Sequence, residues 1–247
     1  MNIKQYLDST YLKTPAQAGL SVVENTEIVK KFIQEAIDES FKLIMIRPDM
    51  VSLAKKMIAK ANSKVLIGTV IGFHEGTNLL QEKLDEANKA ITDGADDLDF
   101  VCNYEAFKKG EIDLVKNEIL QATKLGLQHH KTVKWIIEVA ALNSDQIIQI
   151  SALIKNVVMS NFNEDYYNSV YVKSSTGFYK TENNLPNGAT VSSIIMMLEN
   201  CSPLPVKAAG GVKSYDEAIE MIRLGVKRIG TSSAKAIANE EISTSDY

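Results

Sequence analysis

Short apolar runs alternate along the chain with segments in which apolar residues recur at helical spacing. The runs have the length and composition of buried strands. We expect eight strands, at residues 6–10, 43–47, 65–71, 97–103, 133–139, 170–174, 206–209 and 228–231.

The intervening segments carry helix signals. Apolar residues form a stripe over residues 28–37 and another over 79–91, where the aliphatic stem of Lys83 is expected at the stripe's edge. Ser214 and Glu217 form a capping box that predicts a helix start, and Gly225 is placed to end that helix.

Strict alternation of strands and helices indicates parallel strands joined by helical crossovers. A closed barrel and an open doubly wound sheet both fit this pattern. Eight units in 247 residues favour a single-domain α/β fold, a (β/α)8 TIM barrel spanning residues 1–247 with a polar tail from about residue 239. No glycine-rich nucleotide-binding motif follows the early strands, which weakens the open-sheet alternative.

Composition excludes several classes of protein. The net charge is -4, with 45% hydrophobic and 23% charged residues, so we expect no nucleic-acid partner. No apolar run approaches the roughly 20 residues that span a bilayer, and the start lacks a hydrophobic signal region, so we expect no membrane partner and a cytoplasmic location. Cys102 and Cys201 form no CxxC pair, and Cys102 is expected in the core.

Two lysines, Lys173 and Lys207, each stand at the end of an apolar run and precede small residues and glycine. Lysine is rarely buried without a function or a partner. Burial and a like-charged neighbour lower an amine's pKa, and a neutral amine is what imine-forming catalysis requires. The residues alone do not decide which of the two lysines is the nucleophile.

In α/β barrels, function gathers where the strands end. The predicted ends supply polar and charged side chains: Asp8, Thr10, Arg47, Asp99, Asn103, Glu138, Lys173, Ser174, Thr176, Lys207, Ser232 and Ser233. Asp99 lies within an apolar strand, where an unpaired carboxylate is costly. It could form a structural salt bridge, but we favour a proton-transfer partner for one or both lysines. For Glu138 the two interpretations are equally balanced.

Glycine turns follow the last two strands. Gly210 and Gly211 follow the seventh, and Gly230 precedes Ser232 and Ser233 at the eighth. Barrels of this type bind phosphate at these loops, because glycine lets backbone N–H groups approach an anion. We therefore predict a phosphate site here, to which the nearby cation of Lys213 could contribute.

Metal chemistry is poorly supported. The three histidines are His74, His129 and His130, and they form neither an HxH nor an HxxxH pair. We predict no metal site and no cofactor.

Three motifs resemble those of class I deoxyribose-phosphate aldolase. They are Val172-Lys173-Ser174-Ser175-Thr176-Gly177, Val206-Lys207-Ala208-Ala209-Gly210-Gly211-Val212 and Asp97-Leu98-Asp99-Phe100-Val101. Weaker matches occur at residues 7–13 and 230–233. The family reversibly cleaves 2-deoxy-D-ribose 5-phosphate to D-glyceraldehyde 3-phosphate and acetaldehyde, and serves deoxyribonucleotide catabolism in the cytoplasm.

The resemblance implies a role for each matching residue. Lys173 would form the Schiff base. Lys207 would stay protonated, lower the pKa of Lys173 and join the proton relay, and Asp99 would relay protons. A mobile terminal tyrosine, here Tyr247, would assist proton transfer at the enamine carbon. The phospho-sugar would be bound by Asp8, Thr10, Thr176, Gly177, Gly210, Gly211, Lys213, Ser232 and Ser233.

Some positions depart from the family pattern. Met45 stands in place of a common cysteine, His74 replaces a common proline, and Val139-Ala140 replaces a Thr-Gly pair. The polar loop at 160–169 is long, as is the one at 181–188 that follows the strand of Lys173. None of these departures removes a catalytic group. A homodimer is possible.

Two rival functions remain. A phospho-sugar isomerase or epimerase on the same barrel would use a carboxylate base and need no pair of lysines at strand ends. A non-catalytic sugar-phosphate-binding barrel could keep the glycine turns but has no use for a lysine of lowered pKa. Fold alone does not choose among these functions.

Overall fold

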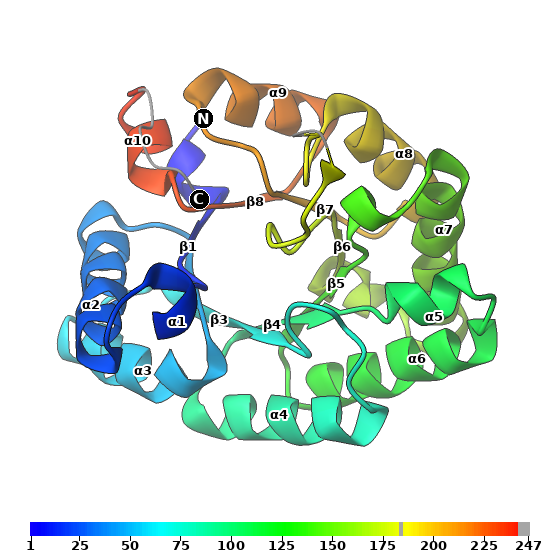
Figure 1. Ribbon diagram of the computed structural model, residues 1–247, viewed down its shortest axis with the longest axis horizontal. Coiled ribbons are helices and arrows are strands. Elements are labelled where there is room, and N and C mark those ends of the chain that lie inside the picture. The colour runs from blue at the N-terminus through cyan, green and yellow to red at the C-terminus, as the bar shows by residue number, and fades with distance from the viewer. Residues whose placement is uncertain (183–184, 242–247) are drawn as a thin grey trace.

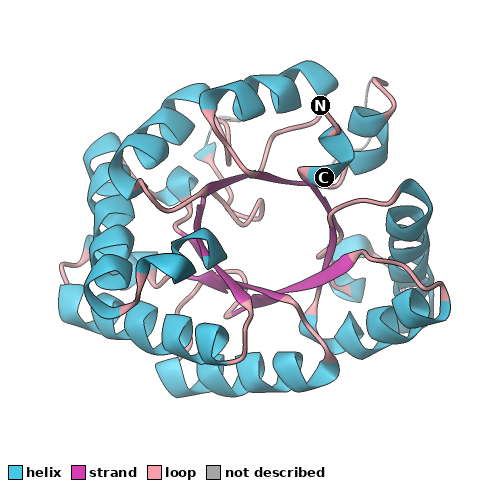
Figure 2. Ribbon diagram, turned by 180° about the vertical axis from the view of Figure 1, so that it is seen from behind, coloured by secondary structure: helices cyan, strands magenta, loops and turns pink. Residues whose placement is uncertain are grey.

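The computed structural model describes residues 1–182 and 185–241 and forms a closed barrel of eight parallel strands. All eight predicted strands are present, so the predicted TIM barrel is confirmed. The strands pair in the order in which they occur along the chain (Figures 1 and 2). They are β1 (Leu7–Thr10), β2 (Leu43–Ile46), β3 (Leu66–Ile71), β4 (Asp97–Val101), β5 (Thr132–Ile136), β6 (Val170–Lys173), β7 (Val206–Ala209) and β8 (Arg228–Thr231).

Helices surround the barrel as an outer ring (Figure 2). The predicted helix start at Ser214 is confirmed, since its hydroxyl accepts the N–H of Glu217, and the same helix ends at Gly225. The helices are α1 (Pro15–Ala18), α2 (Val22–Glu39), α3 (Val51–Lys60), α4 (Leu80–Asp93), α5 (Tyr104–Lys108), α6 (Ile112–Gln128), α7 (Ser144–Asn161), α8 (Val191–Cys201), α9 (Tyr215–Leu224) and α10 (Ala234–Ala238). Among the described residues, none of these helices has the length and apolar character needed to cross a bilayer.

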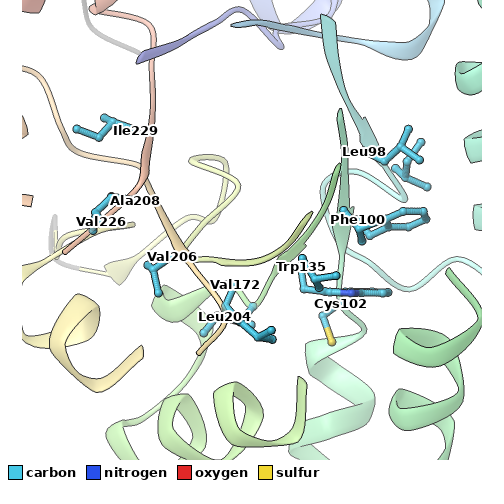
Figure 3. Close-up of a cluster of buried hydrophobic side chains, with 14 of the residues drawn as sticks. Leu98, Phe100, Cys102, Trp135, Val172, Leu204, Val206, Ala208, Val226 and Ile229 are labelled. Carbon is cyan, nitrogen blue, oxygen red and sulfur yellow. The ribbon is translucent and has the colours of Figure 1, made fainter. Parts of the chain in front are cut away.

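The main hydrophobic core lies between the strands and the helices (Figure 3). Phe100 of β4 stacks on Trp135 of β5 with ring centroids 5.3 Å apart, and the indole N–H of Trp135 donates to the hydroxyl of Thr123 on α6. Full burial of one such side chain contributes about 1.5–3 kcal/mol. Cys102 lies in this core, as expected.

The inner face of the barrel is divided chemically. Leu43 and Met45 of β2 and Val70 of β3 form a small apolar cluster with Leu12. Val101 of β4 and Ile136 of β5 belong to a second apolar cluster. Between these clusters, β4 to β8 and β1 each contribute at least one buried charged side chain. Because alternate residues of a strand face opposite sides, Asp97 and Asp99 point inward while Leu98 and Phe100 join the outer core.

The expectation that Lys83 lies at the edge of its helix stripe was wrong. Lys83 is fully buried and forms an ion pair with Glu118 of α6. Its ammonium group also donates to the carbonyl oxygens of Gly76 and Val101, at 2.6 and 2.8 Å. These three acceptors satisfy all three protons, which makes burial of the charge tolerable.

Candidate active site

Lys173, Lys207 and Asp99 meet inside the barrel, near the carboxyl ends of β6, β7 and β4. Lys173 and Lys207 are register partners on neighbouring strands. The Oδ2 atom of Asp99 accepts from both amines, at 2.9 Å from Lys173 Nζ and 2.8 Å from Lys207 Nζ. All three side chains are buried. The structure thus brings together the three residues that the strand-end argument selected.

The environment favours a neutral amine on Lys173. Burial lowers the pKa of Lys173 to about 8; Asp99 opposes this shift, and the charge of Lys207 adds to it. Burial alone would raise the pKa of Asp99, but Lys134, Lys173 and Lys207 hold that pKa well below its usual value. The site therefore joins a lysine of lowered pKa to a carboxylate that stays ionised.

A cavity opens above Lys173 at this end of the barrel. Of the predicted site residues, eight line it: Thr10, Lys173, Thr176, Gly177, Gly210, Gly211, Lys213 and Ser232. Leu12 and Asn187 also line it. Figure 1 shows the loop that follows β6, in yellow, inside the ring of helices. Lys207 and Asp99 are not among the lining residues and lie behind Lys173.

The glycine turns shape the far wall of the cavity. Gly210 and Gly211 have φ values of 80° and 87°, a region that side-chain-bearing residues rarely adopt. A Cβ on Gly188 would lie 2.4 Å from the carbonyl oxygen of Gly210, so the loop before α8 packs directly on this turn. Such turns expose backbone N–H groups on a concave surface, which suits an anion.

Two predicted substrate-binding residues, Asp8 and Ser233, lie away from the cavity lining. Asp8 is fully buried and does not line the cavity; it pairs with Arg228 and Lys207. Ser233 is also buried, and its N–H donates to the hydroxyl of Thr231. Tyr247 lies outside the described residues, so its predicted role is not addressed by the structure.

Glu138 anchors the turn that follows Lys173. Its backbone has a φ of 57°, and its carboxyl group accepts the N–H of Thr176 at 3.1 Å. The same carboxyl group bonds the hydroxyls of Ser175 and Thr176. Burial raises the pKa of Glu138, partly offset by these hydrogen bonds. Glu138 therefore holds in place a segment that lines the cavity.

Sequence reasoning missed three charged residues beneath the lysines. Asp97, Lys134 and Arg228 are buried inside the barrel and pair with one another or with Asp8 and Asp99. A signal did exist for Asp97, which precedes Asp99 by two positions and so shares its face. Lys134 and Arg228 are likewise charged positions within predicted strands.

The histidines do not assemble a metal site. His74 packs against Phe73 and Phe178, with ring centroids 5.8 and 5.7 Å apart. Among the described residues, no group of three or more His, Cys, Asp or Glu side chains is placed to hold a metal ion.

Comparison with known proteins identifies the family of the chain. The sequence matches the DeoC/LacD family aldolase over residues 5–237. It is 36% identical over 238 residues to a deoxyribose-phosphate aldolase of Thermococcus gammatolerans, covering 96% of this chain and 95% of that one. The solved structure "QR15, an Aldolase" superposes with a TM-score of 0.80 at 29% identity, covering 97% of this chain and 96% of that one.

A second solved structure is that of deoxyribose phosphate aldolase from Aeropyrum pernix, described as tetrameric. It superposes with a TM-score of 0.76 at 25% identity, covering 96% of this chain and 89% of that one.

A closed barrel with buried lysines and a carboxylate beneath a cavity at its strand ends is the architecture of a barrel enzyme. The chain belongs to the DeoC/LacD aldolase family. The predicted resemblance to deoxyribose-phosphate aldolase is confirmed, and the protein is an enzyme of that class.

Proposed function

We propose that this aldolase reversibly cleaves 2-deoxy-D-ribose 5-phosphate to D-glyceraldehyde 3-phosphate and acetaldehyde, through an imine on Lys173 and without a metal. One observation carries the proposal. Lys173 is the buried lysine that lines the cavity, and its pKa is lowered to about 8. A neutral amine facing a small-molecule cavity is the nucleophile that imine formation needs.

The reaction follows from the chemistry of that amine. Lys173 adds to the C1 carbonyl of the open-chain sugar, and loss of water from the carbinolamine gives the imine. Removal of the C3 hydroxyl proton breaks the C2–C3 bond, which releases glyceraldehyde 3-phosphate and leaves an enamine. Protonation at C2 and hydrolysis, which returns the water, release acetaldehyde and the free amine.

Asp99 and Lys207 are suited to moving protons in these steps. Asp99 Oδ2 contacts both amines, so a proton can pass between the reacting nitrogen and the carboxylate without rearrangement of the barrel. In the proposed cycle the charge of Lys207 also helps to keep Lys173 neutral. Tyr247, outside the described residues, remains a candidate for the proton transfer at C2.

The phosphate would bind at the wall made by the glycine turns. Gly177, Gly210, Gly211 and Ser232 line the cavity together with Lys213, so N–H groups, a hydroxyl and a cation are available there. Thr10 and Thr176 complete the proposed substrate site. Asp8 and Ser233, which lie behind the lining, would act through their neighbours.

Product analysis tests this function. Purified protein incubated with 2-deoxyribose 5-phosphate in the presence of EDTA should yield acetaldehyde and glyceraldehyde 3-phosphate in equal amounts. Conversion to an isomeric sugar phosphate without acetaldehyde would instead support an isomerase or epimerase, and binding without any conversion would support a non-catalytic barrel. A cytoplasmic location and a homodimer remain predictions.

A further inference from the structure

Six charged side chains form a closed ring inside the barrel, with anions and cations alternating. In order they are Asp8, Arg228, Asp97, Lys134, Asp99 and Lys207, and we call this set the six-charge ring. Arg228 Nε donates to Asp8 at 2.7 Å, and Lys207 Nζ lies 2.6 Å from the other oxygen of Asp8, which closes the ring.

The opposite side of the ring is equally well connected. Lys134 Nζ donates to Asp97 at 2.6 Å and to Asp99 at 2.9 Å. Arg228 Nη2 lies 3.3 Å from Asp97. All six residues are at most 5% exposed. Buried charges cost free energy unless they are paired, so the closed pairing explains how the barrel tolerates them.

Lys173 is attached to this ring and is not a member of it. Its amine contacts Asp99 Oδ2, which already accepts from Lys207. The ring contains three carboxylates and three cations, so its formal charge is zero without Lys173. A protonated Lys173 would add one uncompensated positive charge in a buried site, and a neutral Lys173 would add none.

A further buried carboxyl group, that of Glu138, interacts electrostatically with Lys173. Ser175 Oγ lies 2.8 Å from Glu138 Oε1 and 2.6 Å from the carbonyl oxygen of Asn187, and it also accepts the N–H of Gly177. A hydroxyl has only one proton, so it cannot donate to both oxygens. A protonated Glu138 would supply the missing proton, and burial raises the pKa of this carboxyl group, which favours the protonated form. In that form Glu138 adds no charge to the count.

Tyr171 of β6 is another inward-facing titratable group near the ring. Burial raises the pKa of its phenol, so this side chain is uncharged at neutral pH. The ammonium of Lys134 lies 5.9 Å from the centre of the Tyr171 ring. Strands β2 and β3 contain no titratable side chain. Lys213, which lines the same cavity, is exposed to solvent. The buried charge around Lys173 is therefore set by the six-charge ring.

We propose that Lys134, Asp97 and Arg228 are positioning residues for the reaction, which close a ring of balanced charge and thereby keep the Lys173 amine neutral. This inference rests on the proposed role of Lys173. None of the three residues pairs with Lys173 or lines the cavity. They act on it through the net charge of the ring and through Asp99, which Lys134 holds.

The inference predicts opposite effects for opposite charges. Lys134→Met leaves the ring with a charge of −1, which favours a proton on Lys173, so its pKa should rise by about 1. Asp97→Asn leaves the ring at +1 and should lower that pKa. The double variant Lys134→Met/Asp97→Asn restores zero charge, and its pKa should return toward the wild-type value.

Two readouts measure this pKa. In the first, Lys173 is acetylated with limiting acetic anhydride between pH 6 and 10, and its peptide is quantified by mass spectrometry. In the second, the low-pH limb of kcat/KM is recorded. At pH 7, Lys134→Met should lose about tenfold in kcat/KM for each pKa unit gained, and should recover at high pH. A merely structural role would lower activity equally at every pH.

The matched control is Lys83→Met, which removes an equally buried and ion-paired lysine outside the barrel interior. This variant should leave the low-pH limb of kcat/KM unchanged. If Lys134→Met does not fold alone, the Asp97→Asn variant can be compared with the double variant. The Lys173 pKa should then be higher in the double variant, because the double variant lacks the charge of Lys134. Removing a whole pair disrupts a buried site less than removing one partner.

The inference would be overturned if the Lys173 pKa is unchanged in folded Asp97→Asn and Lys134→Met. It would also be overturned if this pKa shifts in the same direction in both variants. The acetylation readout does not require aldol chemistry. Failure of the proposed function would therefore appear as absent cleavage in the wild type, while the charge effect on Lys173 would still be measurable.

Discussion

Lys173 and Lys207 donate to the same carboxylate oxygen, Oδ2 of Asp99, from neighbouring strands in register. Only Lys173 lines the cavity, whereas Lys207 is enclosed between Asp99 and Asp8. Two lysines that the sequence could not rank are thus distinguished by position. The lysine that lines the cavity is also the one with a pKa lowered to about 8.

The pH dependence of kcat/KM should reveal this amine. Because the neutral form of Lys173 is the proposed nucleophile, kcat/KM in the wild type should rise with pH and level off above about pH 8, the pKa of this amine. Lys207→Leu removes a charge that lowers the Lys173 pKa, so its acetylation profile should move to higher pH. An unchanged acetylation profile in this variant would show that Lys207 does not act electrostatically on Lys173.

Asp99→Asn should lower kcat by roughly 10²–10⁴, the usual cost of a lost proton-transfer group. It should also destabilise the fold by about 3–5 kcal/mol, because Lys134, Lys173 and Lys207 lose a shared buried partner. Urea unfolding and single-turnover kinetics on the folded fraction separate the two effects. Near-normal turnover of folded protein would reduce Asp99 to a structural carboxylate.

Activity should not depend on a metal ion. The ammonium groups and hydrogen-bond donors named above supply the charge stabilisation that the proposed steps need. After exhaustive dialysis against EDTA, kcat should stay within about twofold of the untreated value, a change small beside the loss expected of a missing catalytic group. Loss of activity restored by a divalent ion would place the enzyme in a different mechanistic class.

The phosphate group should contribute strongly to substrate recognition. Unphosphorylated 2-deoxyribose should have a much lower kcat/KM than its 5-phosphate, because remote binding energy also aligns the reacting carbons. Gly211→Val should reduce the difference in kcat/KM between the two sugars, because it places a branched side chain at the proposed phosphate site. Gly110→Val is the matched control, since Gly110 has a similar φ of 80°, has open space around it and lies on a turn that does not line the cavity. An equal kcat/KM for the two sugars in the wild type would contradict the proposed phosphate site.

Much of the fold followed from the sequence because short strand-like runs, several of them broken by a charged residue, alternate strictly with segments in which apolar residues recur at helical spacing. Lys173, Lys207 and Asp99 could be selected for the same reason, since the ends of parallel strands converge on one rim. The six-charge ring could not be predicted, because Arg228 and Asp8 are 220 positions apart and meet only when the barrel closes. The Lys83–Glu118 pair likewise joins two helices, and a single helix stripe carries no information about such a partner.

The covalent site is the central claim, and borohydride trapping tests it most directly. Wild-type protein treated with acetaldehyde and sodium borohydride should gain one ethyl group, located on Lys173 by peptide mass spectrometry. Lys173→Ala and Lys173→Arg should gain none at this site, because neither supplies a neutral primary amine, while folded Lys207→Leu should still be labelled on Lys173. Undiminished trapping in Lys173→Ala, with the adduct on Lys207, would contradict the account.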